Sequence, residues 1–320
     1  MRKFIFKSTA IILSALFLAS CGDNIQKSDD SNAESKISAV YESTIEYDSE
    51  IFTEDVFEDT APESDTSLDI FNSFDADDYF NKIRTVFSRP VPQSHTEIKN
   101  INDVAFMCCL SAINRNSGPI GIVPAKYYIN DTHEDVYFIF LGGTEFKDGQ
   151  ATDIKTDILS GFGKNNDYLT SLIDTVKKAV PENSKLFLAG ISLGGMVAQQ
   201  FISDESIANC YEIVNTTCMG SPLIINEKSS VREGTVRRIE DKKDFIPNLS
   251  IYSVNPFYRL KYSREVISEN GQYENGLYAH TFSYVDNDVW KKYDVAGTEN
   301  GSALLTFNAD NITYYDAPIK

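Results

Sequence analysis

The sequence lacks the residue patterns of metal and nucleic-acid sites. It has only three histidines, and its five cysteines form no Cys-X-X-Cys pair and no Cys/His spacing typical of zinc. We therefore predict no metal. Basic residues are also outnumbered, with 29 Lys and Arg against 47 Asp and Glu and a net charge of −18. Neither the whole chain nor residues 71–320 has the cationic excess that displaces counterions from phosphates, so we predict no nucleic-acid partner.

The N-terminal apolar run is too short to span a bilayer. Residues 10–19 are apolar, follow three basic residues and have the length of a secretory signal. The run ends in Leu-Ala-Ser-Cys, which resembles the bacterial lipobox, where the signal is cleaved before a cysteine that receives lipid. The resemblance implies a lipoprotein signal at 1–21 and an exported protein anchored through Cys21 to the cell membrane or outer membrane. The alternative is a plain secretory signal with a chance cysteine.

Residues 22–70 are dominated by acidic side chains. They contain fifteen Asp or Glu and two Lys, so most of the net negative charge of the chain lies there. Such a segment cannot bury enough apolar surface to fold, and its charges repel one another. We expect a disordered tether that reaches on the order of 40 Å as a flexible coil. Residues 71–320 then have the length of one large α/β domain.

The redox state of the four cysteines in this domain has two interpretations. Cys108 and Cys109 lie in an apolar helical stretch, and Cys210 and Cys218 flank an apolar strand. Buried free thiols and disulfide bridges are both compatible with these positions.

Apolar periodicity predicts alternating helices and strands. Helical spacing is found at residues 77–87, 102–116, 166–180 and 192–204, with Asn102 or Asp103 as the cap of the second helix. Strand-like runs lie at residues 121–144, a hairpin with a polar turn, and at 184–190, 211–221, 235–240 and 258–267, the last an edge strand. This order predicts an α/β fold with a mostly parallel central sheet, helices on both faces and an antiparallel hairpin at one edge. Reactive groups gather at the carboxyl ends of strands in such sheets.

One turn carries three glycines around a serine. Residues 189–195, Ala-Gly-Ile-Ser-Leu-Gly-Gly, follow a predicted buried strand and open a predicted helix. In a Gly-X-Ser-X-Gly turn the serine sits at a strained tip, and backbone packs closely against the flanking glycines, here Gly190 and Gly194. The first helical N–H groups, beginning with Leu193, then face any anion beside Ser192. The alternative is that Ser192 only caps the helix.

A nucleophilic serine needs a histidine base. His95 lies in a proline-rich segment before the predicted sheet, and His133 lies in the polar hairpin turn, on the solvent side. His280 follows the last predicted strands, where a base is required. We therefore predict His280 as the base.

The base in turn needs an acid that orients it. In α/β hydrolases the chain order is serine, acid, histidine, so the acid lies between residues 192 and 280. Asp241 and Asp244 both follow a predicted strand. We predict Asp244, because Phe245-Ile246-Pro247 would bury and stiffen it, whereas Asp241 belongs to a charged run that reads as solvated.

A second oxyanion donor has to come from a different strand end. The run Phe-Leu-Gly-Gly-Thr at residues 140–144 ends a buried strand with two glycines that let the chain approach. We predict that the N–H groups of Thr144 and Leu193 form the oxyanion hole, with Gly143 in support.

These motifs together resemble the class 3 lipase family, the fungal-lipase-like branch of the α/β-hydrolase superfamily. The match covers residues 100–285. The nucleophile turn, the strand end after it and the acid loop of the family are echoed by GISLGG at 190–195, CMGSP at 218–222 and DFIPNL at 244–249. The run FLGGTEFKDGQATDIKTD at 140–157 is similar to the oxyanion segment, which implies that Asp157 supports Thr144.

Several positions depart from the family pattern. Ile191 stands where histidine is usual, Gly142 replaces a common arginine, and no arginine follows Pro222. Residues 145–156, where the family has its lid, are mostly polar. A polar lid buries little surface at an oil interface, which favours an esterase, or a lipase for phospholipids or small acylglycerols, over an interface-activated triglyceride lipase.

The sequence therefore predicts a secreted, lipid-anchored serine carboxylester hydrolase that needs no cofactor. Its expected partners are an ester or lipid substrate and a membrane reached through Cys21. Two alternatives remain at this level. One is a non-catalytic surface-binding module on a hydrolase scaffold. The other is an acyltransferase or amidase that uses the same triad.

Overall fold

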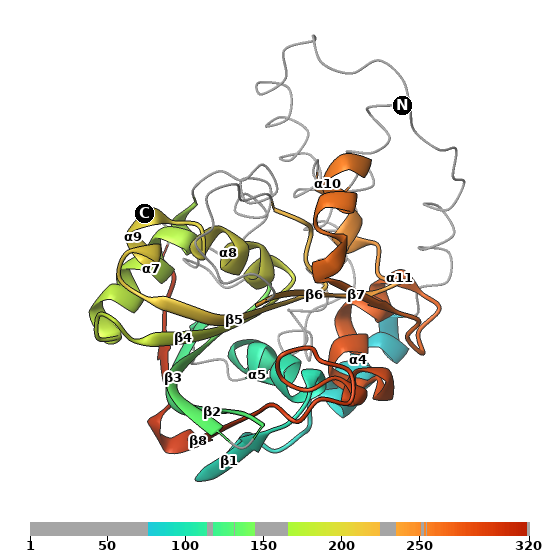
Figure 1. Ribbon diagram of the computed structural model, residues 1–320. Coiled ribbons are helices and arrows are strands. Elements are labelled where there is room, and N and C mark those ends of the chain that lie inside the picture. Colours follow the sequence, from blue (N-terminus) through green and yellow to red (C-terminus); the bar gives the residue numbers. More distant parts are fainter. Residues whose placement is uncertain are drawn as a thin grey trace. The chain divides into compact units, whose positions relative to one another are not determined.

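A twisted sheet forms the centre of residues 84–320 in the computed structural model (Figure 1). The structure describes residues 76–113, 118–130, 132–144, 166–224, 235–250, 253 and 255–318. Cys21, the acidic tether, the polar segment at 145–156 and Asp157 lie outside these residues. The contact pattern separates residues 84–320 from residues 1–83, and helix α4 (Ala76–Val86) runs across that boundary.

The nine described strands follow the order β1-β8-β2-β3-β4-β5-β6-β7, and β9 also pairs with β2. Their bounds are β1 (His95–Ile98), β2 (Ile120–Ile129), β3 (Thr132–Leu141), β4 (Lys185–Ile191), β5 (Glu212–Met219), β6 (Val236–Asp241), β7 (Val266–Glu269), β8 (Leu304–Asn308) and β9 (Thr313–Tyr315). Strands β3 to β7 are parallel, and the pairs that β2 and β8 make are antiparallel. The predicted mixed α/β architecture with a parallel central sheet is confirmed.

The predicted hairpin is present, but its predicted place at the sheet edge is wrong. Strands β2 and β3 pair in antiparallel register from Ile129↔Thr132 to Ile120↔Leu141. The other side of β2 is covered by β8 and β9, with β1 beyond β8. Strands of three to five residues carry too little periodicity to be recognised locally, because long-range pairing decides whether they form.

Because of these extra strands, the predicted positions of His95 and His280 relative to the sheet are wrong. His95 does not precede the sheet, since it is the first residue of β1. His280 does not follow the last strands, because β8 and β9 come after it in the chain.

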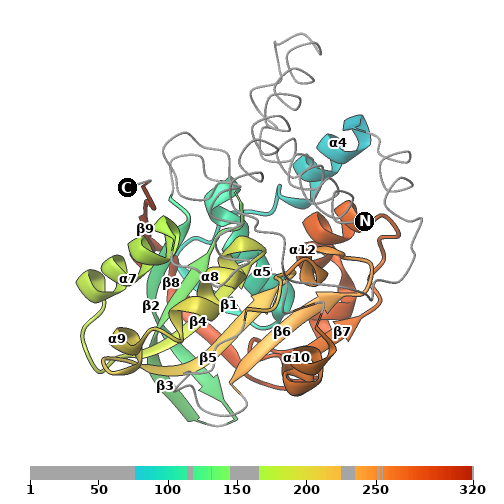
Figure 2. The same cartoon turned by 90° about the horizontal axis from the view of Figure 1, so that it is seen from above.

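Helices cover both faces of the sheet, as predicted (Figures 1 and 2). The described α-helices after α4 are α5 (Ile101–Ile113), α7 (Asp167–Ala179), α8 (Leu193–Phe201), α9 (Glu205–Ala208), α10 (Pro256–Lys261), α11 (Gly276–Tyr278) and α12 (Tyr284–Asp286). Helices α7 and α8 pack on one face, where their apolar side chains join those of β3, β4 and β5 in one buried cluster. Helix α5 lies on the opposite face (Figure 1).

Helix α5 is mostly apolar because most of it is buried: of residues 101–110, only Asp103 and Cys109 are partly exposed. It lies between the sheet and the segment that carries His280. Neither predicted cap performs that role, since the Asn100 Oδ1 atom accepts from the Asp103 N–H at 3.1 Å. The Asn102 amide is buried instead and donates to the carbonyls of Tyr284 and Asn287 at 2.9 and 3.1 Å.

The predicted edge strand at 258–267 is largely wrong. Its first part is helical, because Pro256 occupies the first helical position and the Asn255 side chain accepts from the Phe257 N–H at 3.0 Å. A 3₁₀ turn at Ser263–Glu265 follows, and only the end of the predicted run belongs to β7.

The four cysteines in the described residues are free thiols. Cys108 and Cys218 are buried, and Cys218 lies inside β5 instead of flanking it. Burial raises the pKa of the Cys218 thiol to about 12. Within the described ranges, every helix is too short or too polar to cross a bilayer.

Candidate active site

Ser192 occupies a strained tip between β4 and α8. Its backbone has φ of 53° and ψ of −122°, a left-handed conformation that costs an L-residue about 1–3 kcal/mol. Although the residue stands at the N-cap position of α8, its side chain makes no capping hydrogen bond. The geometry is therefore that of an outward-pointing hydroxyl and not that of an ordinary helix cap.

Close backbone contacts explain the glycines of this turn. A Cβ atom on Gly190 would lie 2.4 Å from the Gly194 carbonyl, and one on Gly194 would lie 2.4 Å from the Gly142 oxygen. A Cβ atom on Gly195 would overlap the Ser221 side chain, whose hydroxyl donates to the Ser192 carbonyl at 2.9 Å. The glycines thus let β4, α8 and the end of β3 approach closely enough to hold the turn.

The structure brings Ser192, His280 and Asp244 into one hydrogen-bonded chain. The His280 Nε2 atom lies 3.0 Å from the Ser192 Oγ atom, and the His280 Nδ1 atom lies 2.9 Å from the Asp244 Oδ2 atom. His280 is 4% exposed and Asp244 is 2% exposed, so water is largely kept from the two inner members. Ser192 is half-buried, which leaves its hydroxyl accessible.

The loop after β6 fixes the Asp244 carboxylate. Its Oδ1 atom accepts from the Ile246 N–H at 2.9 Å, and the Asp244 N–H donates to the Asp241 carbonyl at 2.9 Å. Ile246 and Pro247 begin a buried 3₁₀ turn directly after it. Burial and stiffening by the residues that follow Asp244 are as the sequence predicted.

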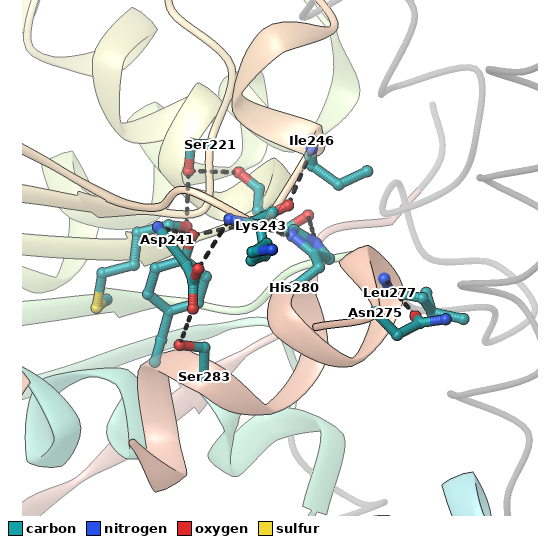
Figure 3. A network of polar contacts seen from close by, with 12 residues as sticks. Ser221, Asp241, Lys243, Ile246, Asn275, Leu277, His280 and Ser283 are labelled. Atoms are coloured by element: carbon teal, nitrogen blue, oxygen red, sulfur yellow. Dashed lines mark hydrogen bonds and ion pairs between the residues drawn. The ribbon is translucent and has the colours of Figure 1, made fainter. Parts of the chain in front are cut away.

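His280 lies in a helical segment with a π-helical turn. The segment starts at α11, continues through the π-helical residues Ala279–Ser283 and ends in α12. The Asn275 side chain caps it by accepting from the Leu277 N–H at 2.9 Å (Figure 3). Gly276 lets this end of the segment pack on the acid loop, since a Cβ atom there would lie 2.6 Å from the Phe245 ring.

Tyr284 is a site residue that sequence reasoning missed. Its hydroxyl donates to the Asp244 Oδ2 atom at 2.7 Å and accepts from the Asp241 N–H at 3.1 Å. Burial, followed by the nearby Asp244 charge, raises the pKa of Tyr284 well above its usual value, so the hydroxyl stays protonated and remains a donor. Its ring stacks on Trp290, with centroids 5.8 Å apart. The only sequence signal is its position four residues after His280.

Asp241 is not the solvated charge that the sequence suggested. It is 1% exposed, and its carboxylate accepts from the Lys243 N–H at 2.9 Å and from the Ser283 hydroxyl (Figure 3). Gly271 packs so closely that a Cβ atom there would overlap the Asp241 carboxylate. One residue of a charged run can be buried where hydrogen-bond donors reach it, here a backbone N–H of the same loop and a hydroxyl from a distant segment.

The end of β3 lies against the nucleophile turn. The Cβ position of Gly143 is 3.3 Å from both the Ser192 Cβ atom and the Ile191 oxygen, and Thr144 follows it, half-buried. Within the described part of the chain, no oxygen accepts from the Leu193 N–H, which belongs to the first turn of α8. This N–H group is available to an anion beside the serine.

The other two histidines stand on the surface, away from this chain of hydrogen bonds. His133 is exposed in β3 beside Lys126, with the two side-chain nitrogens 3.2 Å apart, and His95 is exposed in β1. The described residues hold no group of three or more His, Cys, Asp or Glu side chains placed to bind a metal ion.

The arrangement has the elements of nucleophilic catalysis: a hydroxyl, an imidazole within hydrogen-bond reach and a buried carboxylate behind it. No protein-family model matches the chain, and searches of curated proteins and of solved structures find no match at the significance required.

Proposed function

We propose that the protein is a serine carboxylester hydrolase with an α/β-hydrolase fold. One observation carries the proposal: the Ser192 hydroxyl at a strained strand-to-helix tip is 3.0 Å from the His280 Nε2 atom, whose ring is held by buried Asp244. A buried carboxylate that orients an imidazole toward a hydroxyl is the requirement for an activated serine.

The chemistry follows from these contacts. The Ser192 Oγ atom attacks the ester carbonyl carbon while the His280 Nε2 atom takes its proton, and the N–H groups of Leu193 and Thr144 stabilise the oxyanion. Collapse of the tetrahedral intermediate expels the alcohol, which receives the proton from His280, and leaves an acyl-serine. Water then attacks the acyl carbonyl carbon while His280 takes its proton. The bond to the Ser192 Oγ atom breaks, the serine regains the proton from His280, and the carboxylic acid leaves. Asp244 keeps the Nδ1 proton in place throughout.

The substrate class and location rest on the sequence. The motif set resembles class 3 lipases, with Asp157 supporting Thr144, and the polar run at 145–156 favours esters, phospholipids or small acylglycerols. The lipobox-like segment supports export and lipid anchoring at Cys21.

Labelling with a fluorophosphonate probe tests the proposal. We expect the wild-type chain to be labelled and Ser192→Ala not to be, with turnover of a short-chain ester falling on the order of 10⁶-fold. Ser88→Ala, an exposed serine, is the matched control and should be labelled as wild type. Undiminished labelling of Ser192→Ala, or none of wild type, would contradict the proposal.

The same preparation separates the alternatives. A non-catalytic module gives neither label nor product. An acyltransferase or amidase is labelled but transfers the acyl group to an added alcohol or amine faster than to water, or cleaves amides.

A further inference from the structure

One connection carries most of the exposed apolar side chains. Five large hydrophobic side chains are exposed among the described residues, and three of them, Leu249, Phe257 and Leu260, lie in the connection from β6 to β7. Phe257 is 67% exposed and Leu260 is 75% exposed. Phe257 and Leu260 lie three residues apart on α10, so these two side chains are neighbours on the surface and not isolated residues.

Helix α10 does not bury a face against the sheet, as a crossover helix normally does. None of its residues is buried. It is held instead by Arg259, which donates to the Asn248 Oδ1 atom at 2.6 Å and lies 3.6 Å from the Glu240 carboxylate. Figure 1 shows α10 on the same side of the sheet as α8. Phe257, Leu260 and Lys261 have the i, i+3, i+4 spacing of one helical face.

Two cations lie in or just after α10: Lys261 is its last residue, and Arg264 lies in the 3₁₀ turn that follows. Lys261 and Arg264 are exposed, and neither forms an ion pair with a carboxylate of the described residues. The Lys261 Nζ atom lies over the Tyr262 ring, 5.3 Å from its centroid. The rest of the domain is acidic, so a surface of exposed Phe, Leu, Lys and Arg stands out. Apolar side chains that are flanked by snorkelling cations are typical of membrane-surface elements.

We propose that the α10 surface, defined as Phe257, Leu260, Lys261 and Arg264, docks on an anionic phospholipid bilayer. The inference goes beyond ester hydrolysis and does not depend on it. Charge complementarity favours lipid headgroups, because nearby phosphates attract each cation while the apolar pair enters the interface.

A second copy of the chain fits this surface less well. One Phe and one Leu offer far less than the ~800 Å² per partner of a stable interface. A two-fold contact would also bring the cations of both copies together.

A tryptophan probe tests the docking directly. The chain has one tryptophan, the buried Trp290, so an added indole reports its own surroundings. We expect the emission of full-length Phe257→Trp to shift to the blue with vesicles of phosphatidylcholine and phosphatidylserine, and to be quenched when the lipids are brominated. Ile129→Trp, at the exposed end of β2, is the matched control and should not respond. Because both variants carry the same N-terminus, any lipid on Cys21 affects them equally.

Charge variants test the headgroup contact. In the Phe257→Trp background, Lys261→Gln and Arg264→Gln should each weaken partitioning to anionic vesicles about fivefold and leave the response to pure phosphatidylcholine unchanged. Equal responses at residues 257 and 129 would overturn the proposal. So would a blue shift that grows with protein concentration without lipid, because that result means self-association. Hydrolysis of a short soluble ester should be unchanged in every variant, and a loss of that activity with normal docking would count against the proposed hydrolase alone.

Discussion

The hydroxyl of Tyr284 donates a 2.7 Å hydrogen bond to Asp244, at the same Oδ2 atom that accepts from His280. The histidine and the tyrosine come from one helical segment, so a single piece of chain supplies both donors to the buried carboxylate. Tyr284 does not touch the serine, and we regard it as a positioning residue for the proposed triad.

Tyr284→Phe should lower kcat about tenfold and leave KM unchanged, because the carboxylate loses a donor while the substrate-binding side of the site is untouched. The free energy of unfolding should fall by about 1.5–3 kcal/mol, the usual contribution of a hydrogen bond to a charged group. Steady-state kinetics and urea unfolding measure the two effects. Tyr314→Phe in β9 is the matched control for kinetics. If Tyr284→Phe has the same kcat as the wild-type protein, Tyr284 is not a positioning residue.

Asp241, at the end of β6, and Asp244, in the loop after it, are both buried but should have different roles. Asp244→Asn should reduce kcat on the order of 10⁴-fold, because the imidazole loses the acceptor that fixes its tautomer. Asp241→Asn should keep kcat within about tenfold of wild type and cost about 1–3 kcal/mol of stability, since its partners are the Lys243 N–H and the Ser283 hydroxyl. Kinetics and urea unfolding on both variants decide between these roles. A larger kcat loss in Asp241→Asn would reverse the assignment.

Ser192→Gly should be more stable than Ser192→Ala by about 1 kcal/mol, although both should be inactive. Glycine adopts the left-handed φ of 53° without the Cβ clash that serine and alanine share. The difference is reduced by the greater entropy that glycine loses on folding. Thermal or urea unfolding of the pair measures it. Equal stability would mean that the turn is not strained in solution.

Stability should fall as pH rises above about 10, the unperturbed tyrosine pKa. Burial raises the pKa of Tyr127 and of Tyr284, so both stay protonated in the fold while the unfolded chain loses those protons. Their contribution is complete below pH 10 and is lost as pH rises toward the folded-state pKa, by up to about 1.4 kcal/mol per pH unit for each group. Urea unfolding across this range should show a smaller slope for Tyr127→Phe than for wild type.

Much of this site was readable in the sequence because its motifs are local. The spacing of Ser192 and its glycines was enough to identify the turn, since a strand, a tight turn and a helix are all encoded within twenty residues. His280 could be chosen because the chain has only three histidines. The choice of Asp244 rested on its apolar neighbours, which the structure shows folded around it.

The sequence by itself thus determined the alternation of helices and strands. It also determined which residues are candidates for a site built around a nucleophilic serine. Only the tertiary structure decided which side chains meet. Tyr284 and Asp241 took their places through hydrogen bonds between segments about forty residues apart. Strands β8 and β9 joined the sheet through pairing with β2, far away in the chain. Such contacts leave no local periodicity, because their energy depends on partners that only folding brings near.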